Sequence, residues 1–223
     1  MIKVLIINPN STDEITERIQ KEAGALSNGG LAIEVVSSRK GPEAIVTSYD
    51  EVRAAYYVLE ELSRRSGEYD AAVIACASDP GLQAARELLT VPVTGIFESG
   101  AYACNMHGGR FSVIGSCDWA DIPCFHEVAR RYGLHDHLAS VKYIDTGVCG
   151  VDMSALPLLD EKIEEAKLRD GASAVLLGCA AFAGFGAELS RKHGIYVTDG
   201  ICEAVLAAKS MVKLEIVRRE NHE

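Results

Sequence analysis

The amino-acid sequence predicts an α/β fold of two pseudo-symmetric lobes, each a parallel sheet flanked by helices, with a cleft between them. Runs of apolar and β-branched residues alternate with amphipathic segments along the 223-residue chain, which is typical of parallel sheets covered by helices on both faces. One such run, 71–76, ends at Cys76, and a second, 173–179, ends at Cys179 in the same way. The flanking segments also match, so we expect a repeated α/β unit.

The first half is predicted to contain the strands 2–7, 31–36, 71–76 and 91–94. Its first helix opens at Ser11, which forms a capping box with Glu14. The next helix spans 49–65, with inward positions at helical spacing: Val52, Ala55, Leu59 and Leu62. The loop 41–48 is long enough to fold over a site, and a helix over 80–89 follows the Cys76 strand.

The second half is predicted to repeat this order, with strands over 111–114, 139–144, 173–179 and 195–198. Helices are expected over 97–106, 121–132, 158–168, 185–192 and 200–217. The helix 97–106 is expected to cross from the first half to the second. We therefore predict one lobe of residues 1–97 plus 200–223 and a second lobe of residues 98–199.

The composition argues against several classes of protein. A net charge of −10 and a pI near 5.1 disfavour binding to nucleic acid or to an anionic membrane, since both need clustered Lys and Arg. We find no signal peptide and no apolar stretch long enough to span a membrane, and we expect a cytoplasmic location. Seven cysteines without a CxxC pair fit a reducing compartment rather than a disulfide framework or a metal site.

Cys76 is predicted to lie at the tip of its strand and to face the start of a helix. Ser78 or Asp79 is the expected N-cap of that helix, and Pro80 its first residue. Unpaired N–H groups and the helix dipole would then lower the pKa of the thiol. The alternative is that Cys76 is a small buried apolar residue. The five cysteines outside the repeated runs are interpreted as core or surface thiols: Cys104, Cys117, Cys124, Cys149 and Cys202.

Two opposed thiols suit a proton transfer that needs no cofactor. One cysteine, as thiolate, removes a proton from a carbon acid, and the other, as thiol, returns a proton to the opposite face. The enolate-like charge between these steps would be held by backbone N–H groups after each cysteine. These are the N–H groups of Ala77, Ser78, Ala180 and Ala181. The chemistry is that of a racemase or epimerase.

Three stretches of this chain resemble motifs of the Asp/Glu/hydantoin racemase superfamily, nearest its hydantoin and allantoin racemase branch. They are Asn8-Pro9-Asn10-Ser11, the stretch from Ala75 to Leu82, and Leu177-Gly178-Cys179-Ala180. The resemblance covers essentially the whole chain. It implies two α/β lobes, a cofactor-independent enzyme, a homo-oligomer, and Cys76 and Cys179 as the proton-transfer pair. The superfamily also includes maleate isomerases and arylmalonate decarboxylases, so the fold alone does not fix the reaction.

The resemblance also suggests a substrate class. Amino-acid racemases of the superfamily carry an acidic residue where this chain has Asn8, whose neutral amide can pair with the N–H and C=O groups of a hydantoin. This branch commonly has two threonines and glycines where this chain has Gly115-Ser116 and Ala180-Ala181-Phe182, and these positions are expected to border the pocket. The hypothesis is a racemase of 5-substituted hydantoins or allantoin.

Two alternatives remain open at this point. The first is another enzyme of the superfamily, either an Asp/Glu racemase or a cis-trans isomerase of a small diacid, in which Cys76 adds covalently. The second is a non-catalytic α/β protein that binds a small molecule.

Overall fold

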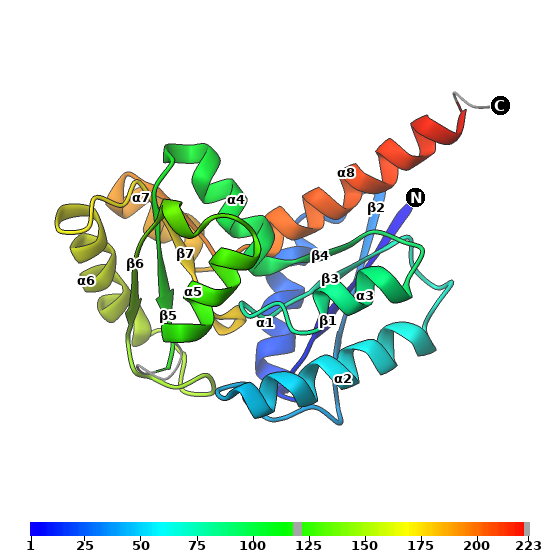
Figure 1. Ribbon diagram of the computed structural model, residues 1–223, viewed down its shortest axis with the longest axis horizontal. Helices are drawn as coiled ribbons and strands as arrows, with labels where there is room; N and C mark the ends of the chain where they lie inside the picture. Colours follow the sequence, from blue (N-terminus) through cyan, green and yellow to red (C-terminus); the bar gives the residue numbers. More distant parts are fainter. Residues whose placement is uncertain (118–121, 221–223) are drawn as a thin grey trace.

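The computed structural model describes residues 1–117 and 122–220, and these contain two parallel four-stranded sheets (Figure 1). In the first sheet the order is β2-β1-β3-β4, and in the second it is β6-β5-β7-β8. The strands of the first sheet are β1 (Ile2–Asn8), β2 (Leu31–Ser37), β3 (Ala71–Ile74) and β4 (Val93–Gly95). Those of the second are β5 (Phe111–Gly115), β6 (Leu138–Tyr143), β7 (Ala174–Leu177) and β8 (Tyr196–Thr198). The two orders correspond strand for strand, which confirms the predicted fold class.

Helices cover both faces of each sheet. Alternate residues of a strand point to opposite faces, so Val4 and Ile6 belong to one buried cluster and Leu5 and Ile7 to another. In the first half, α1 (Asp13–Gly24) and α8 (Ile201–Glu220) contribute to the former cluster, and α2 (Ser48–Arg64) and α3 (Leu82–Leu88) to the latter. In the second half, α4 (Ile96–Gly108) and α5 (Ile122–Arg131) cover one face, and α6 (Ala155–Leu168) and α7 (Gly186–His193) the other.

Two helices connect the halves. Helix α4 begins directly after β4 and packs on β7 and β8 of the second sheet, as expected for a crossing helix. Helix α8 follows β8 and packs on α4 and on β1, β3 and β4 of the first sheet; in Figure 1 it leaves the second half and extends past the first. These contacts support our proposal that one lobe consists of 1–97 plus 200–223 and the other of 98–199.

The structure corrects two helix details. In α2 the buried positions are Ala54, Val58 and Leu62, whereas Val52 is 71% exposed. Leu62 is buried as predicted, and Leu59 is partly buried against the same cluster. In α1 the N-cap is Thr12 instead of Ser11, and it makes no side-chain cap, because its hydroxyl donates to the carbonyl of Glu43.

Most other boundaries agree with the prediction within about three residues. Asp121, the expected first residue of one helix, lies outside the described residues. The described residues also contain two short 3₁₀ turns, His135–His137 and Ala180–Phe182. In the part of the chain that the structure describes, no helix combines the length and apolarity needed to cross a bilayer.

Candidate active site

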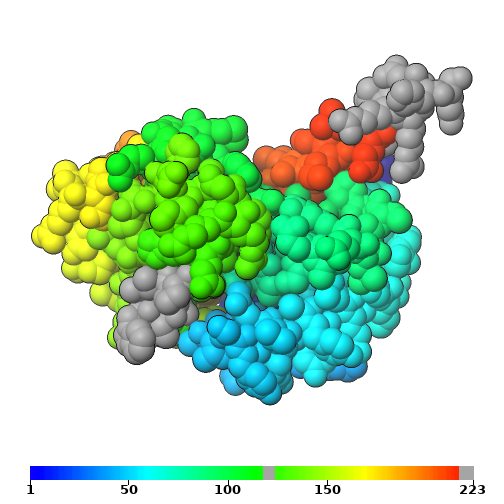
Figure 2. Space-filling view, in the orientation of Figure 1, coloured from blue at the N-terminus to red at the C-terminus, as the bar shows by residue number. Residues whose placement is uncertain are grey.

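A cavity of about 370 Å³ lies between the two halves, at the carboxyl ends of their central strands. Its wall includes Ala75–Ser78 after β3, Ser116 and Cys117 after β5, and Gly178–Ala181 after β7. Residues 45–48, which run into α2, close another side, so the loop 41–48 reaches the site as predicted. Figure 2 shows α2 of the first half beside α5 of the second. Such strand ends are the usual place for ligands in parallel sheets, and the volume suits a small molecule.

The loop that carries Cys76 differs from the prediction. Strand β3 ends at Ile74, and Asp79 N–H donates to the carbonyl of Cys76 over 2.9 Å, which closes a tight turn. Helix α3 begins only at Leu82, after a left-handed Gly81. The predicted N-cap at Ser78 or Asp79, with Pro80 as first helical residue, is therefore wrong.

Asp79 caps a different helix. Its fully buried carboxyl group accepts hydrogen bonds from the N–H groups of Phe97 (3.1 Å) and Glu98 (2.9 Å), at the start of α4, and from the Tyr132 hydroxyl (2.8 Å). A Cβ on Gly95 would stand 2.2 Å from the Asp79 carboxyl oxygen, so only glycine fits there. Burial raises the pKa of Asp79 to about 7, although these hydrogen bonds lower it. Asp79 thus ties the Cys76 loop to the helix that crosses between the halves.

The Cys76 thiol is not activated in the way that the sequence suggested. Its Sγ lies 3.5 Å from the Ser78 hydroxyl. Burial raises the pKa of the thiol to about 12, and hydrogen bonds from the backbone and side chain of Ser78 offset only part of this effect. The charges of Cys179 and Glu51 raise it further. The predicted lowering of the pKa is wrong, because the effect of burial outweighs the hydrogen bonds from Ser78.

Cys179 opens the matching turn of the second half. It follows β7 and is the N-cap of the 3₁₀ turn Ala180–Phe182, with the N–H of Phe182 donating to its carbonyl over 3.0 Å. Ala180 and Ala181 line the cavity, and their N–H groups have no partner within the turn because they open it. Phe182 is buried in the core near Phe185 and does not narrow the pocket.

Arg18 connects this turn to the first half. Its guanidinium, on α1, donates to the carbonyl of Ala181 over 2.9 Å and to that of Val151 over 2.7 Å. Hydrogen bonds from a charged donor are stronger than neutral ones. Arg18 therefore holds the residues after Cys179 and the loop before α6 against the opposite half, next to the cavity.

Two residues that we expected to contact a ligand lie behind the wall. Asn8 is fully buried, and its amide donates to the side chains of Asn10 (2.8 Å) and Thr16 (3.0 Å). Asn10 lines the cavity in its place. Gly115 is packed against the rings of Tyr143 and Phe125, which a Cβ would approach to 2.7 and 3.1 Å. The other predicted contacts line the cavity: Ala77, Ser78, Ser116, Ala180 and Ala181.

The sequence interpretation missed several wall residues. Cys117 and Cys124, interpreted as core or surface thiols, border the cavity, as do Glu51 of α2 and Glu127 of α5. Among the described wall residues these two glutamates carry the only formal charges, and none is a lysine or arginine. Among the sequence features, only the acidic pI indicates that the cavity wall is negatively charged. Within residues 1–117 and 122–220, no three His, Cys, Asp or Glu side chains are grouped as metal ligands.

The fold and the site together define a class of protein, a two-lobed α/β protein in which Cys76 after β3 and Cys179 after β7 line a shared cavity. The chain belongs to the Asp/Glu/hydantoin racemase family, whose model matches residues 4–208.

Known proteins are similar to this chain over nearly its full length. The chain is 34% identical to a hydantoin racemase from Paenarthrobacter aurescens over 218 residues, which are 96% of this chain and 92% of that protein. An allantoin racemase from Klebsiella pneumoniae has a similar structure, with a TM-score of 0.92 and 33% identity over 96% of this chain and 89% of the other. An allantoin racemase from Pseudomonas fluorescens gives a TM-score of 0.91 and 28% identity, with 96% and 92% of the two chains covered.

Proposed function

We propose that this protein is a cofactor-independent racemase of 5-substituted hydantoins or allantoin, with Cys76 and Cys179 as its two proton-transfer groups. The observation that carries the proposal is the pair of cysteines at matching strand ends of one cavity. The hydantoin and allantoin racemases among its relatives support the substrate class.

In the proposed mechanism the stereocentre binds between the two thiols. The thiolate on one side removes the proton, and the thiol on the other side delivers a proton to the opposite face. The negative charge that develops on the carbonyl oxygen next to the stereocentre is stabilised by backbone N–H groups of the two cysteine turns, at Ala77, Ala180 and Ala181. The N–H of Ser78, which also donates to Cys76, belongs to the same turn. The two cysteines exchange roles when the reaction runs in the other direction.

The charges of the wall favour a neutral cyclic amide over a free diacid. Glutamate, aspartate and maleate carry carboxylates that need positive partners when they leave water. The described wall offers two carboxylates and no lysine or arginine. This observation replaces the argument from Asn8, which lies behind the wall. A cytoplasmic location and a homo-oligomeric assembly stay predictions.

The deciding experiment is proton NMR in D₂O with both enantiomers of several 5-substituted hydantoins, allantoin, aspartate and glutamate. We expect loss of the stereocentre hydrogen, coupled to racemisation, for the hydantoins or allantoin alone. Exchange only with the amino acids would move the protein to the amino-acid racemases. No exchange with any compound, from folded protein, would contradict the racemase and favour a diacid isomerase or a binding protein.

The rate should rise steeply with pH. With the pKa of Cys76 near 12, the thiolate is a minor form at neutral pH, and its fraction grows about tenfold per pH unit well below that pKa. In the direction in which Cys76 is the base, kcat/KM should therefore rise with a slope near one between about pH 7 and pH 9. The measurement is initial-rate polarimetry on each enantiomer. A flat profile would mean that the thiolate is already formed at neutral pH.

A further inference from the structure

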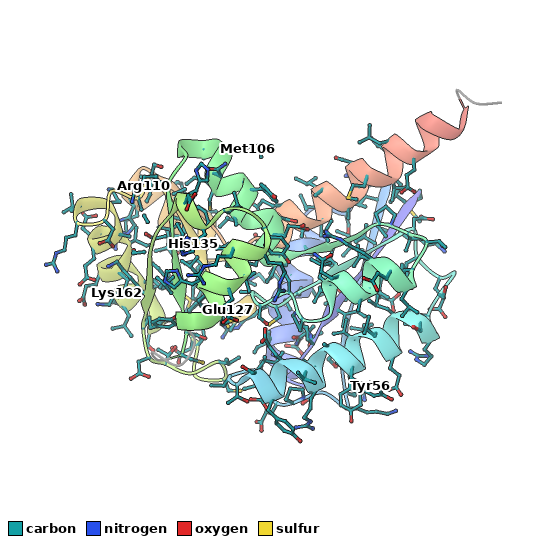
Figure 3. The ribbon with its side chains drawn as sticks, in the orientation of Figure 1. Tyr56, Met106, Arg110, Glu127, His135 and Lys162 are labelled. Carbon is teal, nitrogen blue, oxygen red and sulfur yellow. The ribbon has the colours of Figure 1, made fainter. Side chains whose placement is uncertain are left out.

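Two carboxylates, those of Glu51 and Glu127, stand at the border between the halves. Glu51 lies in the first turns of α2, and Glu127, which is labelled in Figure 3, lies on α5. Both line the cavity. No lysine or arginine of the described residues forms an ion pair with either carboxylate, although other acidic side chains on α2 and α6 have such partners.

Glu51 lies close to the reacting groups. Its charge acts on the Cys76 thiol, and its Oε1 is 3.9 Å from Sγ of Cys124, on α5 of the opposite half. Glu127 follows three residues after Cys124, so the two residues share one face of the helix. The two carboxylates therefore belong to the same wall of the cavity, contributed by the two helices that face each other across it.

A bound hydantoin would orient its substituent toward this wall. With the stereocentre between the thiols and the ring oxygens near the backbone of the cysteine turns, the 5-substituent is the part of the molecule left to reach α2 and α5. A group placed there meets two negative charges, one on the half-buried Glu51 and one on the exposed Glu127. Only a positive group would gain from both.

We infer that the preferred substrates are hydantoins whose 5-substituent ends in a cation, a guanidinium or ammonium group, held by the carboxylates of Glu51 and Glu127. The inference rests on the proposed function, since it assigns the specificity of the same cavity. Glu51 and Glu127 are specificity residues in this scheme and take no part in proton transfer.

The test compares three hydantoins of graded charge, those derived from arginine, citrulline and glutamate. The arginine and citrulline compounds are nearly isosteric and differ mainly in the charge of the terminal group. We expect kcat/KM to be roughly tenfold higher for the arginine compound than for the citrulline compound, from charge-assisted contacts with two partly exposed carboxylates. The glutamate compound should be the poorest of the three. The preference for the cation should shrink in high salt because surface charges are screened.

Single-residue variants test which side chains cause the preference for the cationic substrate. Glu51→Gln should lower the ratio of kcat/KM for the arginine compound over the citrulline compound by about threefold or more, as expected for loss of one such contact. Glu127→Gln should act in the same direction. The matched control is Glu87→Gln, which removes the same charge from the exposed side of α3, outside the cavity, and should leave the ratio unchanged. Circular dichroism of each variant confirms that it is folded.

The outcomes separate the two proposals. If all three hydantoins are racemised equally well, or if the ratio is the same in Glu51→Gln, Glu127→Gln and Glu87→Gln, the specificity inference fails while the proposed function stands. If the citrulline compound is the better substrate, the terminal charge is not what the wall selects. If no hydantoin exchanges its stereocentre hydrogen, the proposed function itself fails.

Discussion

Serine in place of Cys76 or of Cys179 is expected to lower the rate of racemisation by roughly three orders of magnitude, within the range that a positioned acid or base contributes. A serine hydroxyl is a much weaker acid than a thiol, so it is not a usable base at these pH values. The substitution is nearly isosteric and both cysteines are only partly buried, so the variants should fold. The measurement is polarimetry of each enantiomer.

The two variants should differ in hydrogen exchange. When Cys76 is replaced, Cys179 still removes the proton of the enantiomer whose C–H bond faces it, and solvent deuterium returns to the same face. That variant should therefore exchange one enantiomer in D₂O without inverting it. The Cys179→Ser variant should exchange the other enantiomer. This mirrored pattern distinguishes two bases on opposite faces from a single base that acts on both.

The control is Cys149→Ser, which changes an exposed cysteine outside the cavity wall and should keep the wild-type rate. Two results would contradict the mechanism. One is near-normal racemisation by either Cys76→Ser or Cys179→Ser. The other is exchange of the same enantiomer by both variants, which would leave one cysteine without a role in proton transfer.

The sequence predicts the succession of strands and helices and the placing of the two cysteines at strand ends, because both depend on local patterns. Strand and helix periodicity is set by which face of each element is buried. The place of the strand-end residues then follows from one rule, that the carboxyl ends of the parallel strands of a sheet share one edge of that sheet. β3 and β7 occupy matching positions in the two sheets, and the carboxyl ends of both border the cavity, with Cys76 and Cys179 just beyond them.

Features decided by distant residues could not be predicted. The partners of Asp79 lie 18, 19 and 53 positions further along the chain, so its local sequence resembles an ordinary N-cap of α3. Asn10 lines the cavity and Asn8 does not, and the Asn8 amide donates to the hydroxyl of Thr16, eight residues further along the chain. The raised pKa of Cys76 comes from burial by both halves, and no local pattern reports burial of that kind.

The second large effect is expected at Asp79, which has no direct part in proton transfer. Asp79→Asn should lower the free energy of unfolding by about 2–4 kcal/mol, because the amide presents an N–H group to donors that need an acceptor. The lost charge does not add to this effect, since burial raises the pKa of Asp79 and the carboxylate is therefore held at a cost in the folded state. Asparagine tolerates the left-handed backbone of this residue, whose φ is 49°, so backbone strain does not enter. The measurement is urea denaturation at pH 8, above the raised pKa, where Asp79 is a carboxylate.

Activity should fall along with stability in Asp79→Asn, because the same contacts fix the Cys76 loop against α4.

Tyr132→Phe removes only one of the three donors to Asp79, so it should lower the free energy of unfolding by a smaller amount, about 1 kcal/mol. Part of this loss should disappear when Asp79 is already asparagine. Asp152→Asn is the matched control: this carboxylate also accepts a backbone N–H, that of Ser154, but at an exposed turn, where water can replace the lost hydrogen bond and the loss of stability should be much smaller than at Asp79. If Asp79→Asn costs no more than Asp152→Asn, the buried cap does not hold the two halves together, and the position of Cys76 must depend on the strand end alone.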